Sequence, residues 1–101
     1  MDVRVKRVLT KKQLSAALNK LPDWQSNPKQ TFLKATFAQP DYVAGLVFIA
    51  RIAVHAEILQ HHPDITYTYR SVTVKLTTHE LHGLTKLDIE LATRISKLVS
   101  P

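Results

Sequence analysis

Cysteine is absent from this sequence of 101 residues, and glycine occurs only twice. Without cysteine, the protein cannot build a disulfide scaffold, use a catalytic thiolate or hold a metal through sulfur. With so little glycine, it contains neither a P-loop nor a GxGxxG phosphate-binding turn. There is also no Ser/Gly linker, internal repeat or low-complexity segment. We therefore expect a single domain over residues 1–101, with residues 1–8 as a flexible or edge segment.

Long apolar runs are missing as well. The longest charge-free stretch of the apolar middle, residues 42–50, ends at Arg51, well short of the roughly 20 apolar residues that a membrane span needs. The first ten residues carry an acid and lack a long apolar run, unlike a secretory signal. The hydrophobic share of 45% and the charged share of 22% are typical of a globular protein. We expect a soluble, cytoplasmic protein that does not contact a membrane.

Positive charge is concentrated in the first part of the chain. Residues 1–40 contain eight Lys or Arg and two Asp, a net charge of +6, whereas residues 41–101 contain six of each sign. A basic segment can bind nucleic acid or an acidic partner. Here the basic residues are not interleaved with aromatic ones, and no zinc-finger or RNA-recognition motif accompanies them. We expect salt-sensitive attraction to polyanions rather than specific nucleic-acid recognition.

The spacing of apolar side chains predicts three helices, over residues 11–21, 42–60 and 86–99. Thr10 and Gln13 have the spacing of a capping box at the start of the first helix. Asp41 suits the first turn of the long second helix, which cannot run far towards Pro63. Because that helix is apolar almost throughout, we expect it to be the buried spine of the fold. Thr85 is placed to cap the last helix.

Alternating apolar and polar residues predict four strands, over residues 24–26, 31–37, 65–69 and 72–77. The last two flank Arg70 and Ser71, which we expect to connect a β-hairpin. The order helix, two strands, helix, two strands, helix predicts an α+β fold: a four-stranded antiparallel sheet with three helices packed on one face. The other face of such a sheet needs cover, so we expect self-association through it or through an edge strand.

All five histidines fall within about one quarter of the chain: His55, His61, His62, His79 and His82. His61 and His62 stand where the long helix ends, and His79 stands where the hairpin ends; side chains at element ends often point into clefts. One interpretation is surface or capping histidines, which we favour for His55 and His82. A second is a zinc site, although neither HExxH nor another zinc spacing is present. The third is cofactor-free acid–base catalysis by two or three imidazoles.

The residues around these histidines form a pattern with fixed spacing: Glu57, His61, His62, Pro63, Tyr69, His79 and Asp88. Together with the segments AEILQHHPDI, VTVKLTTHELHGLTKLDIELA and PDWQ, this pattern resembles the signature of pterin-4a-carbinolamine dehydratases. The resemblance runs from about Leu9 to Leu98. Two positions depart from the family's pattern: Ile65 stands where the family often has Trp, and Gln60 where it often has an acid. We expect these two residues to change pocket shape and substrate affinity.

The resemblance implies that the protein dehydrates 4a-hydroxytetrahydropterin to quinonoid dihydropterin in tetrahydrobiopterin recycling, with no metal or redox cofactor. It implies that His61, His62 and His79 are the acid–base set, without saying which is acid and which is base. Glu57 lies one helical turn before His61, so we expect the two to share a face. Its carboxylate would then orient an imidazole or bind the pterin, or else be a solvated helix carboxylate.

Three further residues are expected to support the site. Pro63 would fix the backbone that separates His61 from His62, and Thr78 would supply packing and hydrogen bonds. Asp88 stands three residues after Thr85, which is the spacing of a capping box, and we expect it to act indirectly on the loop of His79.

The resemblance further implies a homodimer or homotetramer. The alternative to an enzyme is a non-enzymatic assembly factor or transcriptional coactivator module on the same scaffold.

Overall fold

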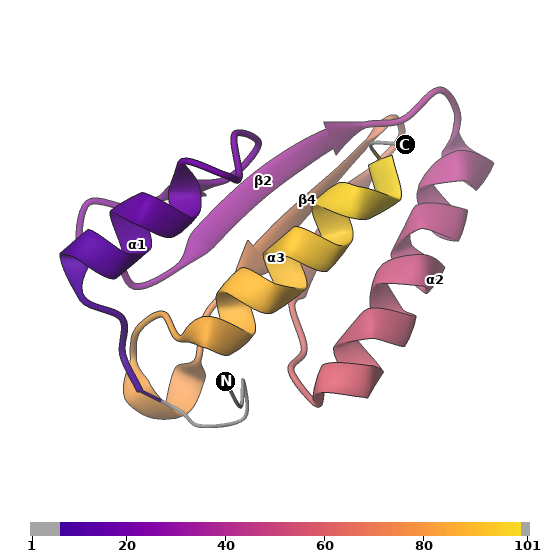
Figure 1. The fold of residues 1–101 in the computed structure, drawn as a ribbon. Coiled ribbons are helices and arrows are strands. Elements are labelled where there is room, and N and C mark those ends of the chain that lie inside the picture. The colour runs from indigo at the N-terminus through magenta and orange to yellow at the C-terminus, as the bar shows by residue number, and fades with distance from the viewer. Residues whose placement is uncertain (1–6, 100–101) are drawn as a thin grey trace.

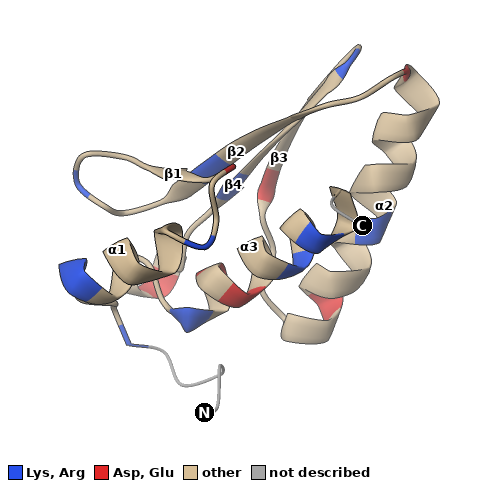
Figure 2. Cartoon of the chain, turned by 45° about the horizontal axis from the view of Figure 1, so that its top comes forward, with Lys and Arg blue, Asp and Glu red and all other residues tan. Residues whose placement is uncertain are grey.

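The computed structural model describes residues 7–99, so most of the segment 1–8, for which we expected flexibility or an edge position, lies outside the described residues. The elements follow in this order: α1 (Lys11–Leu18), β1 (Gln25–Ser26), β2 (Leu33–Ala38), α2 (Tyr42–Leu59), β3 (Asp64–Thr68), β4 (Ser71–Leu76), the short 3-10 helix η1 (His79–Leu81) and α3 (Lys86–Val99). The strands form one antiparallel sheet in the order β1-β2-β4-β3. All three α-helices lie on the same side of it (Figures 1 and 2). The predicted α+β fold is confirmed.

The core lies between the β2–β4 pair and α3. Along each strand every second side chain points to the helices, and the register places the buried ones opposite each other: Leu33 with Leu76, Ala35 with Val74, and Phe37 with Val72. From the other side α3 contributes Leu87, Leu91 and Ile95, all at most 2% exposed. This layer is therefore the spine of the fold, and α3 runs along it in Figure 1.

None of the described helices covers the opposite face of the sheet (Figure 2), and the side chains of β2 and β4 on that face are mostly polar. Lys34 and Lys75 are paired across β2 and β4, as are Thr36 and Thr73, whose hydroxyl oxygens lie 2.9 Å apart. Threonine hydroxyls and lysine ammonium groups remain well solvated on this face, so its composition does not demand cover. The expected self-association through this face or through an edge strand stays a prediction.

The expectation that the long helix is the buried spine is wrong. Only four residues of α2 are buried: Gly45, Phe48, Ile52 and Ala56. Valine and isoleucine side chains on its outer side are more than half exposed, such as Val43 at 67% and Ile58 at 61%. The sequence of α2 is apolar on nearly every side, so it has no polar face to show which side meets solvent.

By length and composition alone, α2 could also cross a membrane: its 18 residues have a mean hydropathy of 1.7, and 22% of them are buried. These two criteria are weak evidence, because helices that pack on the core of a soluble protein pass the same test. In this fold α2 packs against α3 and β4. It also carries two charged residues, Arg51 and Glu57.

A close contact anchors the start of α2 to β3. The ring of Tyr67 stacks on Tyr42 with centroids 4.7 Å apart, and its hydroxyl donates a hydrogen bond to the Tyr42 carbonyl. Gly45 lies beneath this ring, and a Cβ atom there would collide with Cε1 and Oη of Tyr67. A larger residue at this helical position would therefore have to displace the Tyr67 ring.

The element ends largely follow the sequence. Thr10 and Gln13 form the predicted capping box. Asp41 is the N-cap of α2 rather than a member of its first turn, and it accepts a hydrogen bond from the Ala44 N–H. The hairpin connection lies one residue earlier than predicted, because Ser71 pairs with Thr68. This leaves the two residues between them as the connection.

Candidate functional site

The end of α2 turns His61 into the protein. Gln60 adopts the left-handed conformation (φ 50°) as the C-cap, and the His61 N–H then bonds back to the Ala56 carbonyl at 3.0 Å. This reversal leaves the His61 side chain only 8% exposed, with its Nε2 2.6 Å from Asp88 Oδ1. A carboxylate oxygen accepts, so Nε2 carries the hydrogen and Nδ1 is the ring nitrogen left for other partners.

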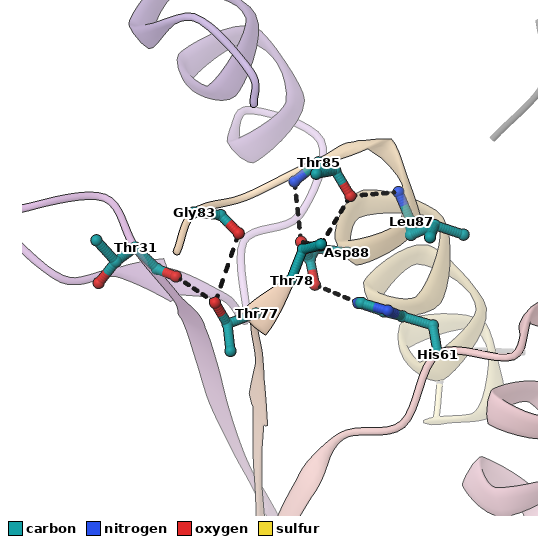
Figure 3. Close-up of polar contacts among 8 residues, drawn as sticks. All are labelled: Thr31, His61, Thr77, Thr78, Gly83, Thr85, Leu87 and Asp88. Carbon is teal, nitrogen blue, oxygen red and sulfur yellow. Dashed lines mark hydrogen bonds and ion pairs between the residues drawn. The ribbon is translucent and has the colours of Figure 1, made fainter. Parts of the chain in front are cut away.

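Asp88 is fully buried and is the centre of a hydrogen-bond network (Figure 3). Its Oδ2 accepts from the Thr85 N–H at 2.9 Å and from the Thr78 hydroxyl at 2.8 Å. The Thr78 and Thr85 hydroxyls also bond to each other at 2.9 Å. The predicted capping role of Asp88 is therefore confirmed at Thr85, and the same side chain directly holds His61. No buried polar side-chain atom in the described residues lacks a partner.

The interaction of Glu57 differs from the prediction. Its Oε2 lies 2.5 Å from Nε2 of His62 rather than near His61. The reason is the turn at Gln60: it ends the helix before His61, so the shared helical face that the spacing predicts does not extend that far. Both partners are exposed, Glu57 at 68% and His62 at 59%. Pro63 follows directly and begins the path into β3.

His79 lies near His61 and His62, although it follows β4 and they follow α2. It begins η1, just after β4, and its side chain is exposed. A hollow of about 190 Å³ is lined by Gln60, His61, His62, Thr77, His79 and Glu80. The structure thus brings the three predicted histidines from two separate segments onto one concave surface.

The other predicted site residues surround this hollow without lining it. Thr78 and Asp88 lie behind His61, and Glu57 contacts His62. Thr77 and Glu80 line the hollow but were not predicted as site residues. Thr77 carried a signal that was missed: it ends the predicted strand next to His79, where side chains reach clefts.

The remaining two histidines have different positions. Nδ1 of His55 lies 3.3 Å from Nη1 of Arg94, between α2 and α3, which agrees with a structural role. His82 is the C-cap of η1 in the left-handed conformation and lies outside the 190 Å³ hollow. Within residues 7–99, no group of three or more His, Asp or Glu side chains is arranged to hold a metal ion.

This arrangement is chemically suited to proton transfer. Imidazole changes its protonation state near neutral pH. Two of the three rings are oriented by carboxylates, His61 by buried Asp88 and His62 by exposed Glu57. An imidazole held in one orientation and tautomer by a carboxylate is a common feature of acid–base sites.

Comparison with known proteins identifies the class to which this fold and site belong. Residues 7–98 match the model of the family described as pterin 4 alpha carbinolamine dehydratase. A Mycobacterium leprae (strain Br4923) protein named "Putative pterin-4-alpha-carbinolamine dehydratase" is 42% identical over 92 residues, which are 91% of this chain and 96% of that protein. The chain therefore belongs to the pterin-4-alpha-carbinolamine dehydratase family, as the motif predicts, and that family acts on a pterin substrate.

Two solved structures are similar in fold. The crystal structure of a transcriptional coactivator/pterin dehydratase from Brucella melitensis superposes with a TM-score of 0.88 at 32% identity, covering 93% of this chain and all of that one. A pterin dehydratase-like protein identified as a RuBisCO assembly factor in the alpha-carboxysome superposes with a TM-score of 0.66 at 23% identity, covering 77% of this chain and 90% of that one. At that identity the second similarity concerns the fold alone.

Proposed function

We propose that this protein dehydrates a 4a-hydroxytetrahydropterin to a quinonoid dihydropterin, with His61, His62 and His79 transferring the protons. The observation that carries the proposal is that these three imidazoles line one hollow. Family membership supports the substrate class.

The reaction needs little besides proton transfer. The C4a–O bond breaks, N5 loses its proton and the C4a=N5 double bond forms, so the products are the quinonoid dihydropterin and water. The N5 lone pair expels the hydroxyl group, so the chemistry requires no metal, redox cofactor or covalent nucleophile. An enzyme contributes a proton for the leaving oxygen and a base for N5–H, each worth roughly 10²–10⁴-fold in rate.

In this proposal the histidines act as one set. Asp88 fixes the orientation of His61 from inside the protein, and Glu57 positions His62 from the outside. His79 approaches from η1, so the substrate is surrounded by rings from both ends of the β3–β4 hairpin. One imidazole must donate a proton and another must accept one, so we assign the acid and base roles to the set and expect activity to fall on both sides of a pH optimum.

The test is a stopped assay of carbinolamine dehydration with purified protein against the spontaneous rate. The proposal predicts dehydration that is proportional to protein concentration and faster than the uncatalysed reaction. Dehydration at the spontaneous rate at every protein concentration would contradict it.

A second candidate is a non-enzymatic protein-binding module. It is favoured by the exposed apolar side of α2 and by the name of the Brucella melitensis neighbour. A stoichiometric protein partner in a pull-down, together with no pterin turnover, would make it the better assignment. Pterin turnover without such a partner would favour the dehydratase over the protein-binding module.

We propose that a second copy of this chain covers the exposed side of α2. A stripe with helical spacing runs along it: Val43, Val47, Ala50, Val54 and Ile58. The stripe is symmetric about its middle. In an antiparallel pair of α2 helices, Val43 would therefore meet Ile58 of the other copy and Val47 would meet Val54, as a two-fold axis requires.

Light scattering coupled to size exclusion tests this interface. Val47→Glu places a charge in the stripe and should reduce the measured mass to that of one chain. Ala53→Glu is the control, because Ala53 is exposed on α2 but lies roughly 100° around the helix from the stripe. A monomeric wild type, or equal masses for the wild type and Val47→Glu, would refute the interface.

A further inference from the structure

A second hollow lies on the other side of His79. Its volume is about 310 Å³, and it is lined by Thr31, Phe32, Lys75, Thr77, His79 and His82. It adjoins the 190 Å³ hollow, because Thr77 and His79 line both. The Thr77 hydroxyl donates to the Thr31 carbonyl at 2.6 Å, which ties the start of β2 to the end of β4 along the wall of this second hollow.

The backbone around the two hollows is unusual. Three non-glycine residues in the described chain have a positive φ: Gln30 (56°), Gln60 (50°) and His82 (50°). Gln60 lines the first hollow, His82 lines the second, and Gln30 directly precedes Thr31 in the wall of the second. The left-handed conformation is sterically unfavourable for any residue with a Cβ atom. Residues that adopt it nevertheless concentrate at functional sites. The second hollow shares this property with the first.

The side chains around the second hollow suit an anion. It has one ammonium group, two imidazoles and two threonine hydroxyls, and none of the described residues that line it is acidic. The Lys75 Nζ lies 4.3 Å from the centroid of the Phe32 ring, which positions the charge at the hollow. Its cross-strand partner on β3 is Asp64, and the described residues show no ion pair between these two side chains.

The chemistry of the substrate connects the two hollows. In a pterin ring C4a is bonded to N5, and N5 is bonded to C6, which carries the substituent. If the C4a hydroxyl and N5 of the ring lie among the three histidines, C6 is only two bonds from the reacting carbon, and its substituent begins at the third bond. His79 stands between the two hollows, so the substituent has a short path from the first into the second.

We propose that the second hollow binds an anionic group, a phosphate or a carboxylate, at the end of the C6 substituent, with Lys75 as its main electrostatic contact. This inference rests on the proposed function and deepens it: the favoured substrate is a pterin with a negatively charged side chain. Lys75 is a specificity residue in this account, because it contacts the substituent and not the reacting atoms.

The test compares carbinolamines that share one ring and differ in the C6 substituent: neutral dihydroxypropyl, phosphate-terminated and carboxylate-terminated. kcat/KM is measured for each, and dissociation constants are measured for the corresponding stable oxidised pterins. We expect the protein to favour at least one anionic ligand over the neutral one, and the phosphate and carboxylate arms identify which. Added salt should reduce the preference.

The variant Lys75→Met and its matched control Lys34→Met test whether the preference for anionic substituents arises at the second hollow. Lys34 pairs with Lys75 across β2 and β4 and is exposed, but it does not line this hollow. Lys75→Met should reduce the anionic-to-neutral ratio roughly fivefold, as expected for one exposed charge pair, and Lys34→Met should leave it unchanged.

Two sets of results separate this inference from the proposed function. Turnover with equal kcat/KM for neutral and anionic substituents, or equal ratios for the two lysine variants, would overturn the inference alone. If no carbinolamine is turned over, the dehydratase proposal fails. The dissociation constants then decide the inference: tighter anionic binding that depends on Lys75 supports it, and equal or absent binding overturns it.

Discussion

Replacing Asp88 with Asn tests the network behind His61 without changing the shape of the side chain. Both neutral donors, the Thr78 hydroxyl and the Thr85 N–H, bond to Oδ2. An asparagine oxygen at that position keeps both bonds. Its NH₂ group then faces Nε2 of His61, where two donors meet in place of the 2.6 Å hydrogen bond.

The expected cost is that of one hydrogen bond to a charged group, about 2 kcal/mol of unfolding free energy. For a domain of this size, 2 kcal/mol lowers the melting temperature by roughly 8–16 °C. The imidazole can avoid the clash by moving its hydrogen to Nδ1, which removes the nitrogen lone pair available to the hollow. We therefore also expect kcat/KM for dehydration to fall by at least roughly tenfold.

Thermal unfolding and steady-state kinetics of the same preparations measure the two effects. Glu90→Gln is the matched control on the same helix, because Glu90 pairs with Arg94 at the surface and should cost roughly 0.5 kcal/mol or less. If Asp88→Asn unfolds at the wild-type temperature with wild-type kcat/KM, the role assigned to Asp88 is wrong.

Two smaller predictions concern other contacts of α2. Gly45→Ala should lower the unfolding free energy by about 1–2 kcal/mol in urea titration, since the methyl group meets the Tyr67 ring; a more stable variant, as helix propensity alone predicts, would contradict the contact. Glu57→Gln should change stability by less than about 1 kcal/mol, because its pair with His62 is exposed, yet kcat/KM should fall severalfold. Unchanged kinetics would instead show that Glu57 is a solvated carboxylate.

The parts of this fold that sequence predicts well are those set by neighbouring residues. Thr10 and Gln13 form their capping box within one helical turn, and alternation identifies Leu33, Ala35 and Phe37 as one face of a strand. The order of the elements then restricts the topology to a few α+β arrangements.

The predictions that failed depend on contacts between residues far apart in the sequence. The bond between His61 and Asp88 joins residues 27 positions apart and depends on the left-handed turn at Gln60, where no glycine signals it. For the same reason helical spacing paired Glu57 with the wrong histidine. The position of α2 could not be predicted, because a helix that is apolar on nearly every side gives no signal of which side is buried and which is exposed.

The three histidines of the candidate site could be predicted from the sequence, whereas the other lining residues and the geometry could not. The motif identified His61, His62 and His79, and the structure places them around one hollow. The motif did not reveal that Thr77 and His79 line a second hollow, because only the fold brings Phe32, directly before β2, next to Lys75 in β4.

The most direct test of the central claim is kcat/KM for carbinolamine dehydration in four alanine variants, at His61, His62, His79 and His55. His55 contacts Arg94 and does not line the hollow, so it controls for the loss of any imidazole. We predict that each of the first three falls at least roughly tenfold below wild type while His55→Ala keeps the wild-type value. Wild-type values in all three, or an equal fall in His55→Ala, would contradict catalysis by these histidines.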